Sequence, residues 1–301
     1  IIALAIIIVW GPSFQTGESL EPEAQDNILF VVDRTGSMNA NDFADGKSRL
    51  DGVKNDIKKI ITSYSDAQFS LVTFDSVALT QVPFTYDAQS VISYVNALTP
   101  QITKYSQGSK IDIGASEITD DLRNEKIRNS KAKNYLFFLS DGENTIGDDP
   151  NNPDLSAFDS AKSFIDGGFV IGYGSIDGSK MKPYNFNSQS NKIGKNQDVI
   201  TDEYIKDPSN NGADAISKIN PILLSNLAQK LGLNYIYSDG KENIATMLPQ
   251  SNENAPNIFQ RGITPIIKPV IWPYEILLAL LALLEFFHFM KMRISIKGRK
   301  A

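Results

Sequence analysis

The 301-residue sequence contains no cysteine and a single histidine, and both scarcities exclude common kinds of chemistry. Without cysteine the chain has no disulfides, no thiol nucleophiles and no thiolate metal ligands. His288 lies in an apolar run near the C-terminus, so the remaining chain offers no imidazole for a Ser-His-Asp triad or a histidine-ligated zinc. These absences weigh against the commonest hydrolase mechanisms.

Charge is also limited, because only 21% of the residues are charged and the net charge is −6. This mild negative balance argues against nucleic acid as the main partner. The 42% of hydrophobic residues are enough to form a proper core. The length fits one domain of ordinary or generous size with appendages.

Apolar runs lie at both ends of the chain. Residues 1–10 carry no charge but are too short to span a bilayer, and the chain begins without methionine. We interpret them as the end of a longer transmembrane helix; a signal-like or buried strand segment is the alternative. Residues 270–292 are mostly apolar, with Trp272 and Tyr274 at one edge like an aromatic belt. This second run predicts a transmembrane helix.

Basic residues follow the second run and predict its orientation. They are Lys291, Arg293, Lys297, Arg299 and Lys300. By the positive-inside rule the tail 293–301 is cytoplasmic, which places the preceding domain on the extracytoplasmic side of the plasma membrane. Glu285 is costly within such a span unless it is paired or hydrated. It either contacts another membrane subunit or pairs with His288 or Lys291 near the inner interface.

Between these ends, short apolar runs alternate with amphipathic stretches, which predicts an α/β fold with a doubly wound, mostly parallel, Rossmann-like sheet. The runs 68–74 and 77–82 flank a turn at Asp75-Ser76 and predict a hairpin with one antiparallel edge strand. Further strands are expected at 28–33, 135–139, 169–173 and 234–237. Helices are expected at 50–64, 87–98, 111–122, 155–165, 221–231 and 242–248.

These patterns divide the chain into an α/β domain with terminal appendages. We expect a transmembrane end at 1–10, a linker at 11–26, the domain at 27–250, a linker at 251–269, a transmembrane helix at 270–292 and a tail at 293–301. Within the domain, residues 181–219 are rich in Asn, Ser, Lys and Gly and predict a surface elaboration.

Polar side chains leave the first predicted strand in one short loop. Asp33 ends the apolar run, and Thr35 and Ser37 follow at alternate positions. A carboxylate and two hydroxyls are hard oxygen ligands of the kind that suits Mg²⁺ or Mn²⁺. Asp141 follows a later apolar run, and loops from neighbouring parallel strands converge at the carboxyl edge of such a sheet. If the two strands are neighbours, Asp33 and Asp141 meet.

The Asp33-x-Thr35-x-Ser37 pattern, together with Ser140-Asp141-Gly142, resembles the metal-ion-dependent adhesion site of von Willebrand factor type A domains. The similarity continues through Ser48-Arg49-Leu50, Ile111-Asp112-Ile113-Gly114-Ala115 and Asn226-Leu227-Ala228 to Tyr235. With the C-terminal span, the whole chain resembles the membrane-anchored Bat-type bacterial proteins of aerotolerance operons. The family's usual motif has serine where Thr35 stands, and Thr35 keeps the hydroxyl.

The resemblance implies a non-enzymatic binding module. Asp33, Thr35, Ser37 and Asp141 would hold Mg²⁺, with Mn²⁺ or Ca²⁺ as alternatives. A protein partner would complete the coordination with an Asp or Glu, and Arg34 and Glu143 would lie beside that contact. Because Bat-type relatives are associated with MoxR-type ATPases, such a membrane assembly is implied as a partner by the resemblance alone.

One position departs from the family pattern. A threonine normally stands in the second loop where this chain has Ile111, which cannot ligate a metal. Ser109 or Asp112 could substitute from the same loop, or the site could be degenerate and the protein a metal-independent structural subunit of a membrane complex. Turn or helix-capping roles for Asp33 and Ser37 are a further alternative. An enzyme is the least favoured reading, with Glu143 as its candidate base.

Overall fold

The computed structural model describes most of the chain between residues 26 and 244 and one helix near the C-terminus. The described residues are 26–64, 67–103, 108–146, 149, 153–184, 204–207, 210–241, 244 and 279–291. The chain divides into two compact units, one spanning Glu23–Gly262 and the other combining Ile1–Pro22 with Ile263–Ala301.

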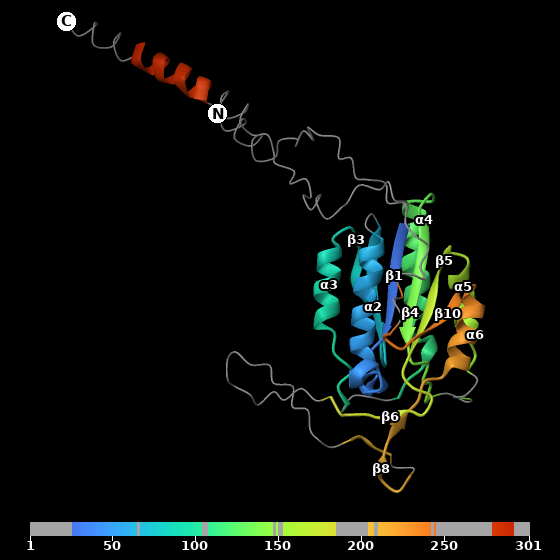
Figure 1. The fold of residues 1–301 in the computed structure, drawn as a ribbon. Helices are drawn as coiled ribbons and strands as arrows, with labels where there is room; N and C mark the ends of the chain where they lie inside the picture. The colour runs from blue at the N-terminus through green and yellow to red at the C-terminus, as the bar shows by residue number, and fades with distance from the viewer. Residues whose placement is uncertain are drawn as a thin grey trace, which may run out of the picture. The chain divides into compact units, whose positions relative to one another are not determined.

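The larger unit is built on a six-stranded sheet with the order β10-β5-β4-β1-β2-β3 (Figure 1). Every neighbouring pair is parallel except β2–β3, which is antiparallel and places β3 at the edge. The predicted mostly parallel sheet with one antiparallel edge strand is therefore confirmed. Its strands are β1 (Asp26–Asp33), β2 (Gln68–Phe74), β3 (Ala78–Thr85), β4 (Lys133–Ser140), β5 (Gly167–Tyr173) and β10 (Asn234–Ser238).

Helices cover both faces of this sheet, as a doubly wound fold requires (Figure 1). On one face lie α2 (Arg49–Ser63) and α3 (Ala88–Ala97), and on the other lie α4 (Ala115–Arg128), α5 (Asp159–Lys162) and α6 (Pro221–Leu231). Short 3₁₀ turns complete the layers: η1 (Gly36–Asn39), η2 (Ala44–Gly46), η4 (Ile111–Gly114) and η5 (Ser156–Phe158).

The central strand β1 supplies side chains to both cores. Phe30 and Val32 pack in the cluster beneath α2 and α3, whereas Leu29 and Val31 pack in the cluster beneath α4 and α6. Side chains alternate between faces along a strand, and a sheet covered on both faces needs apolar residues at every position. This requirement explains the uninterrupted apolar run that ends at Asp33.

Helix α2 begins with a capping box. The Ser48 hydroxyl accepts a hydrogen bond from the Asp51 backbone N–H at 3.1 Å, and the Ser48 backbone N–H donates to the Asp51 carboxylate at 3.3 Å. Helix α6 begins as its sequence predicts, with Pro221 in the first turn and the Asn220 side chain accepting from the Leu223 N–H at 3.0 Å. Both caps fix helix starts at the carboxyl edge of the sheet.

The region around Gly167 and Gly168 differs from the expectation. We expected a helix over 155–165 and a strand from 169, but the structure forms only η5 and the short α5 in the first range, and both glycines begin β5. Gly168 has φ +127°, and a Cβ at this position would lie 1.9 Å from the carbonyl oxygen of Leu136. The glycine therefore serves close strand packing and not helix termination.

The expected surface elaboration is partly described. It contains two small antiparallel pairs, β6 with β9 and β7 with β8. Figure 1 places β6 and β8 at the carboxyl edge of the main sheet. The bounds of these strands are β6 (Ser179–Lys180), β7 (Lys206–Asp207), β8 (Ala213–Asp214) and β9 (Ile216–Ser217).

The second unit contributes one described helix, over residues 279–291. Among the described residues, no helix has both the length and the apolar character needed to cross a membrane. The apolar run 1–10 and the remainder of 270–292 lie outside the described residues, as does the helix expected at 242–248 apart from residue 244.

Candidate functional site

Strand pairing brings the two predicted loops together. In the parallel pair of β1 and β4, Val32 lies opposite Leu139, so Asp33 and Ser140 leave the sheet side by side. The Ser140 hydroxyl donates a 2.6 Å hydrogen bond to Asp33 Oδ2. The neighbouring placement that the sequence required for one shared site is therefore present.

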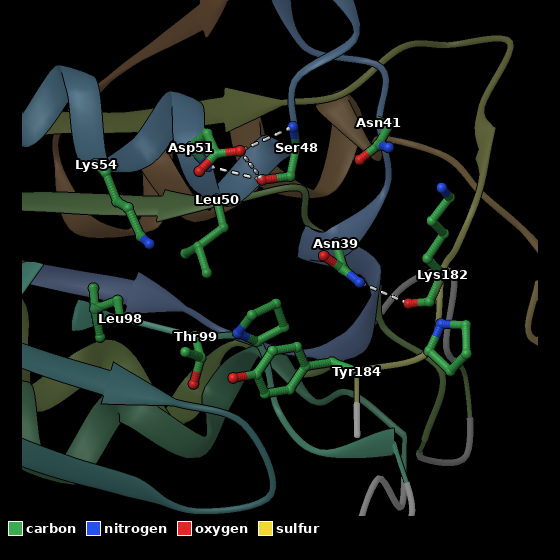
Figure 2. Close-up of a pocket in the computed structure, with 12 residues that line it drawn as sticks. Asn39, Asn41, Ser48, Leu50, Asp51, Lys54, Leu98, Thr99, Lys182 and Tyr184 are labelled. Carbon is green, nitrogen blue, oxygen red and sulfur yellow. Dashed lines mark hydrogen bonds between the residues drawn. The ribbon is translucent and has the colours of Figure 1, made fainter. Parts of the chain in front are cut away.

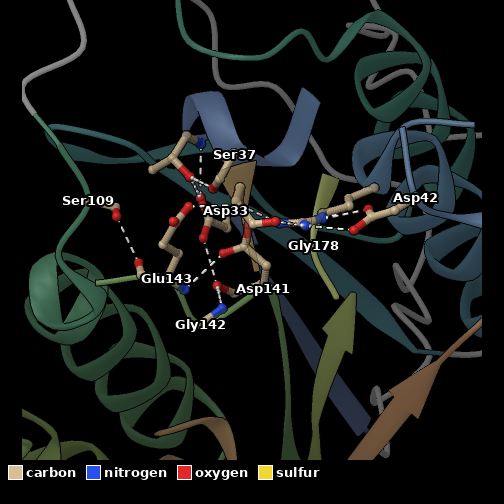
Figure 3. A network of polar contacts seen from close by, with 12 residues as sticks. Asp33, Ser37, Asp42, Ser109, Asp141, Gly142, Glu143 and Gly178 are labelled. Carbon is tan, nitrogen blue, oxygen red and sulfur yellow. Dashed lines mark hydrogen bonds and ion pairs between the residues drawn. The ribbon is translucent and has the colours of Figure 1, made fainter. Parts of the chain in front are cut away.

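The first loop forms a chain of oxygen atoms that begins at Asp33 (Figure 3). Asp33 Oδ1 accepts from the Thr35 backbone N–H at 2.9 Å and from the Thr35 hydroxyl at 2.7 Å. The Thr35 hydroxyl lies 2.9 Å from the Ser37 hydroxyl. All three side chains are buried. Asp33 thus has the turn role that we considered as an alternative, and it also joins two hydroxyls into one cluster.

The second loop turns sharply after Asp141. Gly142 has φ +70°, and a Cβ there would lie 2.7 Å from Leu224 Cγ and 2.9 Å from the Asn220 carbonyl oxygen. Asp141 Oδ1 accepts from the Glu143 backbone N–H at 2.9 Å, and the Asp141 carbonyl accepts from the Asn220 N–H at 2.8 Å. Only glycine suits this turn, because it needs positive φ and lacks space for a side chain.

A fully buried arginine holds Asp141 from the other side. Arg49, the first residue of α2, places Nη1 at 2.7 Å from Asp141 Oδ2 and binds Asp42 through Nε and Nη2, both at 2.8 Å. It also donates to the Ser217 hydroxyl at 2.7 Å and to the Ser217 carbonyl at 3.0 Å. The Arg49 side chain has 0% exposure. It therefore joins α2, the Asp141 loop and β9.

Glu143 completes the cluster. Its Oε2 accepts from the Ser217 hydroxyl at 2.8 Å. Burial and the nearby Asp141 carboxylate raise the pKa of Glu143 to about 7, against the hydrogen bond from Ser217. Burial and Asp141 also raise the pKa of Asp33 to about 7, against the hydrogen bonds from Ser140 and Thr35. Both carboxylates are thus destabilised in their charged form by crowding of negative charge.

The second-loop candidates are not equivalent. Ile111 is 2% exposed and packs in the core, while its N–H donates to Asn144 Oδ1 at 3.1 Å. Asp112 pairs with Lys110 at 2.8 Å. Ser109 donates to the Glu143 carbonyl at 2.7 Å and so touches the loop that carries the cluster (Figure 3). Of the two substitutes, Ser109 is therefore the one that the structure connects to the site.

Arg34 lies between Asp33 and Thr35 in the sequence but takes no part in this cluster. Its Nε lies 3.0 Å from Asp75 Oδ2, and both side chains are partly exposed. The Arg34 carbonyl accepts from the Gln101 N–H at 2.6 Å. These contacts anchor the loop that carries Asp33, Thr35 and Ser37 to the β2–β3 turn and to the segment that follows α3.

The donor set fits a divalent cation in its chemistry. The Arg49 guanidinium contacts the carboxylates of Asp141 and Asp42, whereas Asp33 and Glu143 are held by hydroxyl groups. Two hydroxyls, from Thr35 and Ser37, add neutral oxygen donors. Among the described residues, no three His, Cys, Asp or Glu side chains are grouped so that they could hold a metal ion by themselves. A cation at this place would therefore also need the Thr35 and Ser37 hydroxyls.

The topology and the loop cluster together define a doubly wound α/β domain with an oxygen-rich site at the carboxyl edge of its sheet. Residues 28–143 match the model of the von Willebrand factor type A domain family. The match ends at the residue that completes the cluster. No curated protein matches the chain.

Solved structures share the fold. An aerotolerance-related membrane protein from Bacteroides fragilis, carrying multiple mutations to serine, superposes with a TM-score of 0.58 at 20% identity, covering 74% of this chain and 96% of that one. BatB from Bacteroides thetaiotaomicron gives a TM-score of 0.58 at 19% identity, covering 74% and 94%. The motifs indicated a fold like that of von Willebrand factor type A domains, and the match over residues 28–143 and these two structures bear out that fold.

Sequence reasoning missed the residues that join the loops from a distance. Arg49 belongs to a stretch that resembles the family, but the sequence predicted no role for it. It also predicted no role for Asp42, Ser140 or Ser217. One local signal was available for Arg49. A positive charge in the first turn of a helix is unfavourable for the helix dipole, so an arginine there indicates a tertiary reason for its presence.

Proposed function

We propose that this von Willebrand factor type A domain binds a protein partner through a divalent cation, Mg²⁺ or alternatively Mn²⁺ or Ca²⁺. Asp33, Thr35 and Ser37 would hold the ion, and Asp141 would help directly or through water. The bound ion would supply a strong, directional positive charge to an Asp or Glu of the partner.

The observation that carries this proposal is the excess of buried negative charge at Asp33, Asp141 and Glu143. Burying a carboxylate is costly unless a positive charge compensates it. Arg49 is already shared between Asp141 and Asp42. Nothing in this cluster offsets Asp33, which its neighbours satisfy with hydrogen bonds alone. A cation bound at the Asp33 loop would lower the pKa of both raised carboxyls and remove this cost.

Each protein group has a separate task in this mechanism. Asp33 supplies the charge, and Ser140 orients it through the hydrogen bond to Oδ2. Thr35 and Ser37 supply hydroxyl oxygens. Arg49 fixes the position of Asp141. Glu143, with Oε2 held by Ser217, lies beside the cluster and limits which partner groups can approach.

Metal binding is tested first, by calorimetric titration of the full chain with MgCl₂ after removal of metal with EDTA. We expect binding by the unmodified chain, loss of binding in Asp33→Ala, and no change in Asp120→Ala, whose carboxylate is 64% exposed in α4. Saturation at about 100 times Kd should also stabilise the unmodified fold by about 2.7 kcal/mol. A titration in which Asp33→Ala retains the heat of binding would contradict this site.

Partner binding is tested next, by pull-down from solubilised membranes in Mg²⁺ and in EDTA. We expect a partner that is retained in Mg²⁺ and released by EDTA or by Asp33→Ala, while circular dichroism shows an intact fold. The proposal is for binding without catalysis, in line with the family. Turnover of any substrate that disappeared in Glu143→Gln would overturn that part.

We further propose that the chain is anchored in the plasma membrane, with the domain on the extracytoplasmic side. One solved structure with this fold carries the description of an aerotolerance-related membrane protein. In the helix 279–291, large apolar side chains are exposed, among them Leu284 at 67%, Phe286 at 59% and Phe289 at 59%. Such a surface suits lipid.

The absence of cysteine allows a direct test of this topology. In intact cells, a membrane-impermeant maleimide should label Ser93→Cys, on the exposed surface of α3, but not Ser295→Cys in the basic tail. Labelling of the tail and protection of the domain would invert the proposed orientation.

A metal-independent structural subunit is the second candidate. Two observations favour it: Ile111 is buried where the family has a ligating threonine, and Arg49 already neutralises Asp141. In this case chelation would leave the membrane complex intact, whereas Glu285→Leu would disrupt it. A complex that survives Glu285→Leu and dissociates in EDTA would rule this candidate out.

A further inference from the structure

A cavity lies beside the loop that carries Asp33, Thr35 and Ser37, and it has no role in the function proposed so far. It has a volume of about 340 Å³, within the range of small ligand pockets. Its walls come from four segments: the end of η1 with Asn41, the start of α2, Leu98–Pro100 and Lys182–Tyr184 (Figure 2). We refer to it as the Lys54 cavity.

The Lys54 cavity is lined in part by segments that adjoin the proposed metal site. Asn39 lines the cavity and belongs to the same 3₁₀ turn as Ser37. Pro100 also lines it and precedes Gln101, whose N–H donates to the Arg34 carbonyl at 2.6 Å. A peptide bound at the Asp33 loop would therefore pass close to the cavity mouth.

The wall formed by Lys182–Tyr184, which is far from η1 in the sequence, is held in place by hydrogen bonds. Asn39 Nδ2 donates to the Lys182 carbonyl at 2.7 Å. Tyr184 exchanges two backbone-anchored bonds with Thr103, one from the Thr103 N–H to the Tyr184 carbonyl and one from the Tyr184 N–H to the Thr103 hydroxyl, both 2.8 Å. The cavity is thus preformed, so little ordering would be needed when a ligand binds.

The lining combines positive charge with an apolar floor. Lys54 carries an ammonium group that forms no ion pair within the described residues, whereas Lys182 turns its carbonyl toward Asn39 and its ammonium group away from Lys54 (Figure 2). Lys54 makes one long hydrogen bond, 3.4 Å from Nζ to the Asn96 carbonyl. The Asp51 carboxylate is engaged by the Ser48 hydroxyl at 2.7 Å. Leu50 and Leu98 provide apolar surface near these charges.

Burial lowers the pKa of the Lys54 ammonium, although Asp51 works against this shift. A partly desolvated ammonium without a carboxylate partner gains most from an anion that enters the same space. A glutamate side chain matches both parts of the lining, because its methylene groups suit Leu50 and Leu98 and its carboxylate suits the Lys54 ammonium.

We propose that the Lys54 cavity receives a glutamate side chain of the partner segment whose other acidic residue binds at the Asp33 loop. This inference rests on the proposed metal-dependent function and makes it more specific. The partner would present two acidic residues on one segment, the first for the cation and the second for Lys54.

The test uses synthetic peptides with one Asp and one Glu separated by glycine spacers of increasing length. Each has a matched control peptide in which Glu is replaced by Gln. Fluorescence anisotropy with the full chain in MgCl₂ should show that, at the best spacer length, the Glu peptide binds roughly tenfold more tightly than its control. This ratio should fall to about one in Lys54→Gln.

Lys58→Gln is the matched control variant. Lys58 lies one turn further along α2, so its replacement removes the same charge from the same helix without altering the cavity lining. We expect Lys58→Gln to keep the tenfold preference. Circular dichroism confirms that each variant is folded.

The outcomes separate this inference from the function on which it rests. Metal-dependent binding of both peptides with no preference for Glu would overturn the cavity assignment and leave the metal site standing. A preference for Glu that depends on Lys54 but persists in EDTA would support the cavity and overturn the metal. Binding of neither peptide at any spacer length would overturn both.

Discussion

Replacing Arg49 by methionine should destabilise the domain more than any surface charge substitution. The Arg49 side chain is fully buried and forms ion pairs with Asp141 at 2.7 Å and with Asp42 at 2.8 Å. Methionine keeps most of the aliphatic volume but leaves the buried Asp141 carboxylate without a cation. It also removes two hydrogen bonds to Ser217.

The expected loss can be estimated from measured pairs of this kind. Breaking a buried ion pair by removing one partner costs about 3–5 kcal/mol, a large part of a typical stability of about 5–15 kcal/mol. For a domain of this size such a loss lowers the melting temperature by roughly 6–20 °C. Arg49→Lys, which keeps the charge but not the bidentate contact with Asp42, should lose less.

The assay is urea unfolding of the full chain followed by circular dichroism, in EDTA so that metal does not contribute. Arg123→Met is the matched control, because its ion pair with Asp120 is exposed at 45% and 64%. Such pairs contribute about 0–1 kcal/mol. If Arg49→Met lost no more stability than Arg123→Met, the structural role assigned to the buried guanidinium would be refuted.

Three further results are expected. Gly168→Ala should destabilise the fold by several kcal/mol, because its Cβ would lie 1.9 Å from the Leu136 carbonyl oxygen. Gly114→Ala, whose Cβ would have its nearest contact at 3.6 Å, should be tolerated, and thermal melts compare the two variants. Burial acts to raise the pKa of Asp42, but hydrogen bonds from Arg49 and Ser175 outweigh it and hold the pKa below 3.8. A carboxyl whose pKa is lowered on folding contributes stability above its pKa in the unfolded chain, and this contribution is lost as the pH falls through its pKa in the folded protein. Asp42→Asn should therefore reduce the loss of stability below about pH 4, as measured by urea midpoints across pH. Tyr173→Phe should cost about 1 kcal/mol in the same assay, because it removes the 3.1 Å hydrogen bond to buried Asp56.

Periodicity was enough to predict the sheet. The apolar runs that became β1 and β4 are continuous because both faces of the sheet are covered, and this pattern is readable without a structure. The hairpin of β2 and β3 was predicted from the turn at Asp75-Ser76. The helix expected over 155–165 is shorter in the structure, and β5 begins at Gly167 and Gly168, where close packing against the β4 backbone requires glycine at Gly168.

The candidate site shows the same division. Asp33, Thr35, Ser37 and Asp141 could be selected from the sequence because each follows a strand, and strand order alone decides whether such loops meet. The protonation states and the hydrogen-bond partners of these side chains could not be predicted from the sequence. The pKa of Asp33 depends on burial and on Asp141, which lies more than a hundred positions away.

The sequence by itself determined the α/β class, the carboxyl-edge loops and the oxygen donors, since local periodicity and residue chemistry are sufficient for these. Only the tertiary structure decided that Arg49 neutralises Asp141, that Ser109 and not Asp112 contacts the Asp141–Glu143 loop, and that a lysine-lined cavity opens beside η1. The physical reason is that these features depend on contacts between segments far apart in the chain. A single sequence does not show which distant segments contact each other, whereas packing in the folded domain fixes those contacts.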